Sequence, residues 1–110
     1  MDKEVLFKLA KLIEDRRASK PKESYVKSLL EGGNETINKK IYEEALELIE
    51  ASSTNDSTKK KKVIHETADL WFHTMVLLVN EGIKFEDILV ELETRLGTSG
   101  HEEKSSRKKN

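Results

Sequence analysis

The chain has 110 residues, which is enough for one domain with one hydrophobic core and too few for a second catalytic domain. Charged residues make up 37% of the chain but the net charge is only -1, so there is no overall positive field to attract nucleic acid. The absence of cysteine excludes disulfides, thiolate metal sites and cysteine nucleophiles, and no apolar run has the length of a signal or membrane-spanning segment. We therefore expect one cytoplasmic domain over residues 1–110, with neither a membrane nor a nucleic acid as partner.

Five segments have helical periodicity and none has the alternating pattern of a strand, which predicts an all-α bundle of about five helices. In chain order they span residues 3–18, 23–31, 35–51, 59–82 and 85–96. Leu12 and Ile13 of the first helix are expected in the core. Gly32 and Gly33 supply the left-handed residue that commonly ends a helix. The polar tail, residues 98–110, is expected to be mobile.

The third and fourth predicted helices carry acids about one turn apart, which places the acids of each helix on one face. On a helical wheel, Glu44 falls within the edge of an apolar stripe, and a polar stripe interrupts an otherwise nearly all-apolar fourth helix. The residues of this polar stripe are Glu66, Asp69, His73 and Asn80. Since unpaired buried charge is very costly, the stripe must meet a polar partner or coordinate an ion. We expect His73 and Asn80 to support such a site rather than to be its ligands.

Two interpretations of the acids stay open on this evidence. In the first, they are salt-bridge partners on solvated helix faces. In the second, Glu44, Glu47, Glu66 and Asp69 surround a divalent cation, because carboxylate pairs about 5 Å apart repel by roughly 3 kcal/mol at an effective dielectric near 20. Oxygen ligands favour Mg²⁺, with Mn²⁺ as a substitute, and Mg²⁺ held by a few carboxylates indicates chemistry on a polyphosphate. Glu43 is then available as a general base.

The carboxylate pairs, E-x-x-E at Glu44 and Glu47 and E-x-x-D at Glu66 and Asp69, are accompanied by motifs along the whole chain. These are I-E-D-R at residues 13–16, S-Y at 24–25, K-I-Y-E-E-A at 40–45, A-D-L-W-F-H-T-M-V-L-L at 68–78 and R-L-G-T-S-G-H-E-E-K-S-S-R at 95–107. Together they resemble the phosphoribosyl-ATP pyrophosphohydrolases, a branch of the MazG-like all-α nucleotide pyrophosphohydrolases. The tail motif separates this branch from general MazG-like enzymes. Tyr42 stands where the family usually has glycine, which removes no ligand.

The resemblance implies Mg²⁺-dependent hydrolysis of the α–β phosphoanhydride of 1-(5-phosphoribosyl)-ATP to phosphoribosyl-AMP and pyrophosphate, the second step of histidine biosynthesis. It implies a homodimeric bundle, metal ligation by the four acids of the two pairs, and a place for Lys40 and Glu43 beside the metal and phosphates. The chain lacks the length and the cysteines of a cyclohydrolase domain, so the next step is expected to belong to a separate protein.

Substrate phosphates need cationic and polar contacts beyond the metal. The candidates for substrate binding are Arg16, Ser24, Tyr25, Arg95, Lys104 and Arg107. The last two lie in the tail, which glycines at 97 and 100 would allow to close over the phosphates. The lysine run at residues 59–62 is interpreted as a solvated helix start. Two rival functions are a house-cleaning nucleoside triphosphate pyrophosphatase and a non-catalytic helical dimerisation module.

Overall fold

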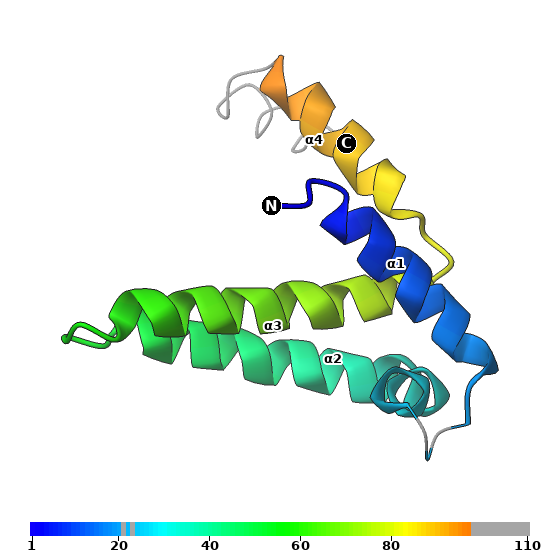
Figure 1. Cartoon of the computed structure of the whole chain (residues 1–110), viewed down its shortest axis with the longest axis horizontal. Helices are drawn as coiled ribbons and strands as arrows, with labels where there is room; N and C mark the ends of the chain where they lie inside the picture. Colours follow the sequence, from blue (N-terminus) through cyan, green and yellow to red (C-terminus); the bar gives the residue numbers. More distant parts are fainter. Residues whose placement is uncertain (21, 23, 98–110) are drawn as a thin grey trace, which may run out of the picture.

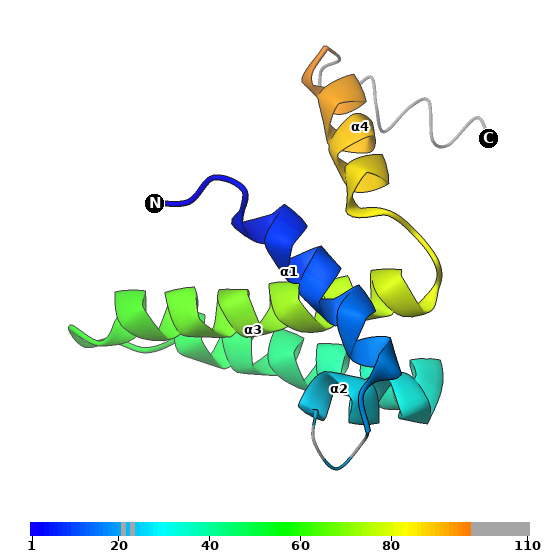
Figure 2. The same ribbon diagram turned by 45° about the vertical axis from the view of Figure 1, so that its right-hand side comes forward.

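The computed structural model describes residues 1–20, 22 and 24–97. Within these residues the chain forms four α-helices, a short 3₁₀ helix and no strand, which confirms the predicted all-α class. The elements are α1 (Val5–Asp15), η1 (Arg16–Ala18), α2 (Tyr25–Ser52), α3 (Lys59–Asn80) and α4 (Phe85–Leu96). The long helices α2 and α3 lie side by side, α1 crosses α3, and α4 extends away from this pair (Figure 1, Figure 2).

The helix α2 contains a bend at Gly33, whose φ of 69° and ψ of -168° belong to a region that is nearly exclusive to glycine. The sequence predicted two helices here, over residues 23–31 and 35–51. The structure confirms the break, because the backbone at Gly33 is not helical and separates α2 into two helical segments that follow each other without a loop. The described residues thus contain the predicted five helical segments, two of which are joined across the bend within α2. The arm before the bend starts at Tyr25 and turns out of line with the rest of α2 (Figure 1).

The hydrophobic core lies where α1, the bend of α2 and the second half of α3 meet. Its buried members are Ile13, Val26, Leu29, Ile37, Met75, Val76 and Val79. Burial of one such side chain contributes roughly 1.5–3 kcal/mol, so these contacts fix the two long helices against α1. Ile13 is fully buried as predicted, but Leu12 is 42% exposed. The prediction for Leu12 was wrong because neighbouring helical residues point about 100° apart, which places Leu12 on the flank of α1.

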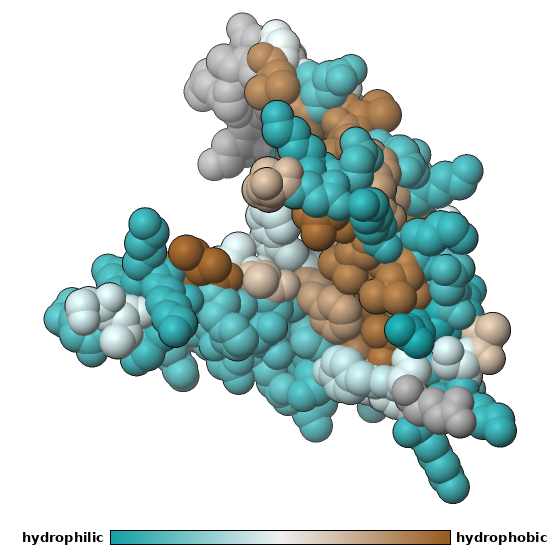
Figure 3. All heavy atoms as spheres, in the orientation of Figure 1, coloured by the Kyte–Doolittle hydropathy of each residue, from teal (hydrophilic) through white to brown (hydrophobic). Residues whose placement is uncertain are grey.

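Large apolar side chains remain exposed on the outer faces of α2 and α3. They include Tyr42, Leu46, Ile49, Ile64 and Trp71, and Trp71 is 55% exposed. A shallow apolar groove of about 310 Å³ runs beside Trp71 and Ile64. A single chain therefore leaves part of the apolar surface of α3 uncovered. Apolar side chains also gather along α1 and α4 (Figure 3). None of the described helices combines the length and apolarity needed to span a membrane.

Candidate metal centre

The acids predicted to meet do lie together between α2 and α3. Single ligand atoms of Glu44, Glu47 and Glu66 all lie within 4.8 Å of one another, and the same holds for His65, Glu66 and Asp69. Glu66 belongs to both groups and so joins them. The four acids of these two groups, Glu44, Glu47, Glu66 and Asp69, are called the carboxylate cluster.

Helix geometry and one turn produce this convergence. The two acids of each helix are three residues apart, so they share a face. Between the helices, the Asp56 carboxylate accepts a hydrogen bond from the Thr58 backbone N–H at 2.8 Å, which closes a short turn and starts α3. The chain therefore returns along α2 (Figure 1), and this brings acids of α3 close to acids of α2.

The cluster is electrostatically unfavourable by itself. Glu44 is only 8% exposed. Burial, together with the neighbouring charges of Glu47, Asp69 and Glu66, raises the pKa of Glu44 to about 7. Burial and the adjacent Glu47 also raise the pKa of Glu66. Burial and the neighbouring negative charges therefore both disfavour the ionised forms of Glu44 and Glu66.

Two oxygens of the cluster have no partner within the described part of the chain. Glu44 Oε2 and Glu66 Oε2 are inaccessible to water and accept no hydrogen bond from those residues. A carboxylate oxygen can only accept, so each needs a hydrogen-bond donor or a cation. The cluster contains neither lysine nor arginine, and oxygen ligands suit Mg²⁺ or Mn²⁺. The residues present therefore fit a divalent cation.

His73 is buried near Glu44 and forms two hydrogen bonds. Its Nδ1 lies 2.9 Å from the backbone oxygen of Asp69, and since a carbonyl oxygen only accepts, Nδ1 carries the hydrogen. In the neutral ring, Nε2 then accepts from the Tyr25 hydroxyl at 2.8 Å. The same Nδ1 lies 3.9 Å from Glu44 Oε1. His73 thus connects the start of α2 with the main chain at Asp69, rather than with the Asp69 carboxylate.

Other predicted residues have defined places. Lys40 Nζ lies 3.3 Å from Glu43 Oε2, one turn before Glu44, and this pairing raises the pKa of Lys40. Ser24 caps α2, because its Oγ accepts a hydrogen bond from the Lys27 backbone N–H at 3.1 Å. Asn80 follows Asp69 by about three turns, or about 16 Å along α3, and donates to Asn34 at 2.6 Å. The structure does not bring Asn80 to the carboxylate cluster.

The predicted phosphate-binding cations are not gathered at the cluster. Arg16 is exposed in η1, and Arg95 pairs with Glu91 at 3.1 Å near the end of α4. Among the residues that the structure describes, no hydrogen bond or ion pair joins Arg16 or Arg95 to the cluster. Lys104 and Arg107, and with them the tail predicted to be mobile and to close over the phosphates, lie outside the described residues.

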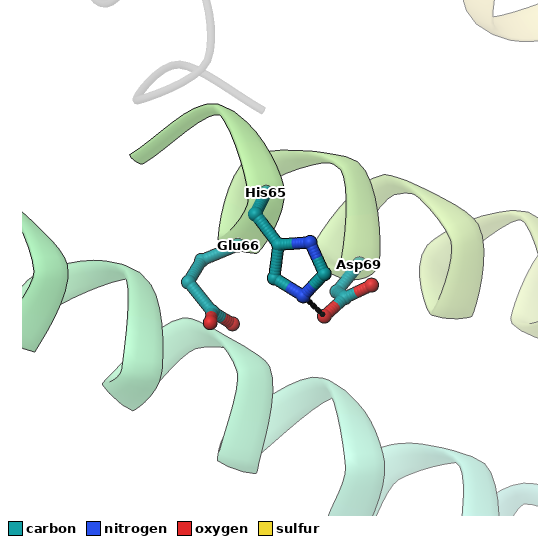
Figure 4. Close-up of side chains that lie close together, drawn as sticks. All are labelled: His65, Glu66 and Asp69. Carbon is teal, nitrogen blue, oxygen red and sulfur yellow. Dashed lines mark ion pairs between the residues drawn. The ribbon is translucent and has the colours of Figure 1, made fainter. Parts of the chain in front are cut away.

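His65 was not predicted from the sequence as a site residue. Its Nε2 lies 3.3 Å from Asp69 Oδ2, and Glu66 points toward the same space (Figure 4). The available signal was the spacing of four residues between His65 and Asp69, which places both on one helix face.

Fold and site together define a class, that of all-α proteins in which two neighbouring helices present a carboxylate cluster fitted to a divalent cation. The family model described as phosphoribosyl-ATP pyrophosphohydrolase matches residues 6–96. The chain belongs to this family. The membership confirms the resemblance seen in the motifs and, with it, the prediction of an enzyme.

Curated relatives match over nearly the whole chain. A phosphoribosyl-ATP pyrophosphatase of Nitrosospira multiformis is 50% identical over 97% of this chain and 86% of its own length. That of Chromobacterium violaceum is 47% identical over 98% of this chain and 97% of its own length. That of Hydrogenovibrio crunogenus is 43% identical over 100% of this chain and 98% of its own.

Proposed function

We propose that this chain hydrolyses the α–β phosphoanhydride of 1-(5-phosphoribosyl)-ATP, with Mg²⁺ as cofactor, to phosphoribosyl-AMP and pyrophosphate. The observation that carries the proposal is the carboxylate cluster with its two unpartnered oxygens, found in a member of the phosphoribosyl-ATP pyrophosphohydrolase family. The reaction is the second step of histidine biosynthesis. We place it in the cytoplasm and assign the following cyclohydrolase step to a separate protein.

The cluster residues Glu44, Glu47, Glu66 and Asp69 would hold the cation. When bound, Mg²⁺ or Mn²⁺ supplies positive charge that stabilises the phosphate oxygens as the anhydride breaks. His73 holds the main chain at Asp69 in place, so that the ligands keep their spacing.

The proton chemistry is proposed for Glu43, beside the cluster. Its carboxylate accepts a proton from the attacking water as the water oxygen bonds to phosphorus and pyrophosphate leaves. Lys40 holds Glu43 by the 3.3 Å pair and is itself exposed enough to contact a phosphate oxygen. Further phosphate and ribose contacts are proposed for Arg16, Ser24, Tyr25, Arg95, Lys104 and Arg107.

We also propose that the protein is a homodimer. The exposed apolar faces of α2 and α3, with the groove beside Trp71, form a surface that monomeric proteins rarely expose. A second copy bearing the same surface covers it by twofold symmetry. Dimerisation then completes the core around the two long helices.

The decisive experiment measures pyrophosphate release from phosphoribosyl-ATP and from ordinary and modified nucleoside triphosphates, each with Mg²⁺ and with a chelator. We expect release from phosphoribosyl-ATP that requires Mg²⁺ and falls by at least about 100-fold in Asp69→Asn, as loss of a metal ligand predicts. Asp87→Asn, the same change at an acid on α4, is the matched control and should retain activity. Release from modified triphosphates alone would replace the proposal with a house-cleaning pyrophosphatase. Absence of release from every substrate would leave only the dimerisation module.

A further inference from the structure

We propose that His65 is a nitrogen ligand of the divalent-cation site, and that it shifts the preference of the site from Mg²⁺ towards Mn²⁺ and Co²⁺. The inference rests on the cation proposed above for the carboxylate cluster. It adds a ligand that neither the motifs nor the family membership assigned.

The position of His65 carries the argument. Its Nε2 lies 3.3 Å from Asp69 Oδ2, and one ligand atom each of His65, Glu66 and Asp69 fall within 4.8 Å of one another (Figure 4). Three ligand atoms this close can share one cation, since metal–ligand distances are about 2.0–2.2 Å. Because Glu66 is also grouped with Glu44 and Glu47, the imidazole stands at the edge of the same cluster.

An ordinary surface ion pair between His65 and Asp69 is the alternative explanation. Such a pair, four residues apart on a helix, contributes only about 0.3–0.5 kcal/mol and needs no third partner. Here a third group is present, because Glu66 lies beside the pair and its Oε2 is inaccessible to water and accepts no hydrogen bond from the described residues. The buried Glu44 offers a second unpartnered oxygen to the cluster. These unpartnered oxygens indicate a cation rather than a solvated pair.

A nitrogen donor changes which cation the cluster prefers. Mg²⁺ is a hard cation that favours oxygen ligands and retains water. Imidazole suits transition metals, and their affinity rises from Mn²⁺ to Co²⁺ along the first row. His65 is largely exposed, so its ring can turn toward a cation without disturbing the core.

The experiment uses the full chain loaded with Mn²⁺. Electron spin echo modulation detects a nitrogen directly bonded to Mn²⁺, and calorimetric titration gives the Mn²⁺ and Mg²⁺ affinities. We expect nitrogen modulation in the wild type that disappears in His65→Phe and in His65→Glu. His65→Phe should weaken Mn²⁺ binding at least about tenfold and Mg²⁺ binding much less. A tenfold loss is already typical when a residue that only hydrogen-bonds to a metal ligand is removed. His65→Glu, which restores an oxygen ligand, should move the preference towards Mg²⁺.

Three results would overturn the inference. Nitrogen modulation that persists in His65→Phe would assign the nitrogen to His73. Bound Mn²⁺ without nitrogen modulation in the wild type would remove His65 from the site and leave the proposed hydrolysis untouched. A wild-type chain that binds no divalent cation at all would overturn both the ligand assignment and the metal dependence proposed above.

Discussion

Substitution of Gly33 by alanine tests whether the bend in α2 is held by backbone geometry. At φ 69° and ψ -168°, an L-residue with a Cβ is strained by about 1–3 kcal/mol. An added Cβ would meet no atom within 4 Å, so the cost is backbone strain and not a clash. Alanine also lowers the entropy of the unfolded chain, but its mismatch with the native backbone outweighs that gain. We expect a net loss of about 1–2 kcal/mol in the free energy of unfolding.

Urea denaturation at fixed protein concentration measures this loss. Gly97→Ala is the matched control, because Gly97 has a φ of -85° and its added Cβ would meet only a backbone oxygen at 3.9 Å. The control should change stability by less than about 0.5 kcal/mol, as for an ordinary surface substitution. A Gly33→Ala variant as stable as Gly97→Ala would refute the assignment of the bend to a glycine-only conformation.

Three further predictions concern the cluster and its surroundings. With chelator present, the free energy of unfolding should fall as the pH rises from 5 to 8. The pKa of Glu44 is about 7 in the folded chain and 4.5 in the unfolded chain, so the folded state binds more protons in this range. Glu44→Gln should make this pH-dependent loss of stability smaller by about 1–2 kcal/mol, a value that allows for screening by solvent. The same pH dependence in Glu44→Gln as in the wild type would contradict the prediction. Tyr25→Phe keeps the aromatic ring beside Phe72 but removes the hydroxyl that bonds to His73 Nε2. We expect the free energy of unfolding, measured by urea denaturation, to fall by about 1 kcal/mol. An unchanged denaturation midpoint would show that this hydrogen bond does not stabilise the fold. Trp71→Glu places a charge on the proposed dimer surface, so light scattering should show a dimer for the wild type and a monomer for the variant, and a monomeric wild type would reject the interface.

The spacing of the acids predicted which of them share a helix face, but it left open whether they form a cluster or solvated ion pairs. Two residues three apart on each helix share a face, and Glu44 lies within an apolar stripe, so its burial followed from the sequence. Asn80 shares the polar stripe of Glu66 but lies about three turns further along α3 than Asp69, and a helical wheel discards this distance along the axis. Wheels compare angles only.

Other features depended on tertiary structure. The glycines before residue 34 signalled the break in α2, but the direction of the second segment relative to the first depends on packing in the core. The exposure of Trp71 could not be predicted from helical periodicity either. Periodicity indicates that a helix face is apolar, but it does not indicate what covers that face. His65 looked like one polar residue among many, and its relation to Glu66 appears only when the side chains are placed.

The two dry carboxylate oxygens of Glu44 and Glu66 also bear on the lifetime of the protein in a cell. A cation present at about 100 times its dissociation constant adds about 2.7 kcal/mol to the stability of a fold that binds it. Domains of this size have only about 5–15 kcal/mol in total. Molecules that carry the cation should therefore open more rarely and resist proteases longer than those that do not. With the metal dependence proposed above, the supply of divalent metal would set the amount of the enzyme as well as its rate.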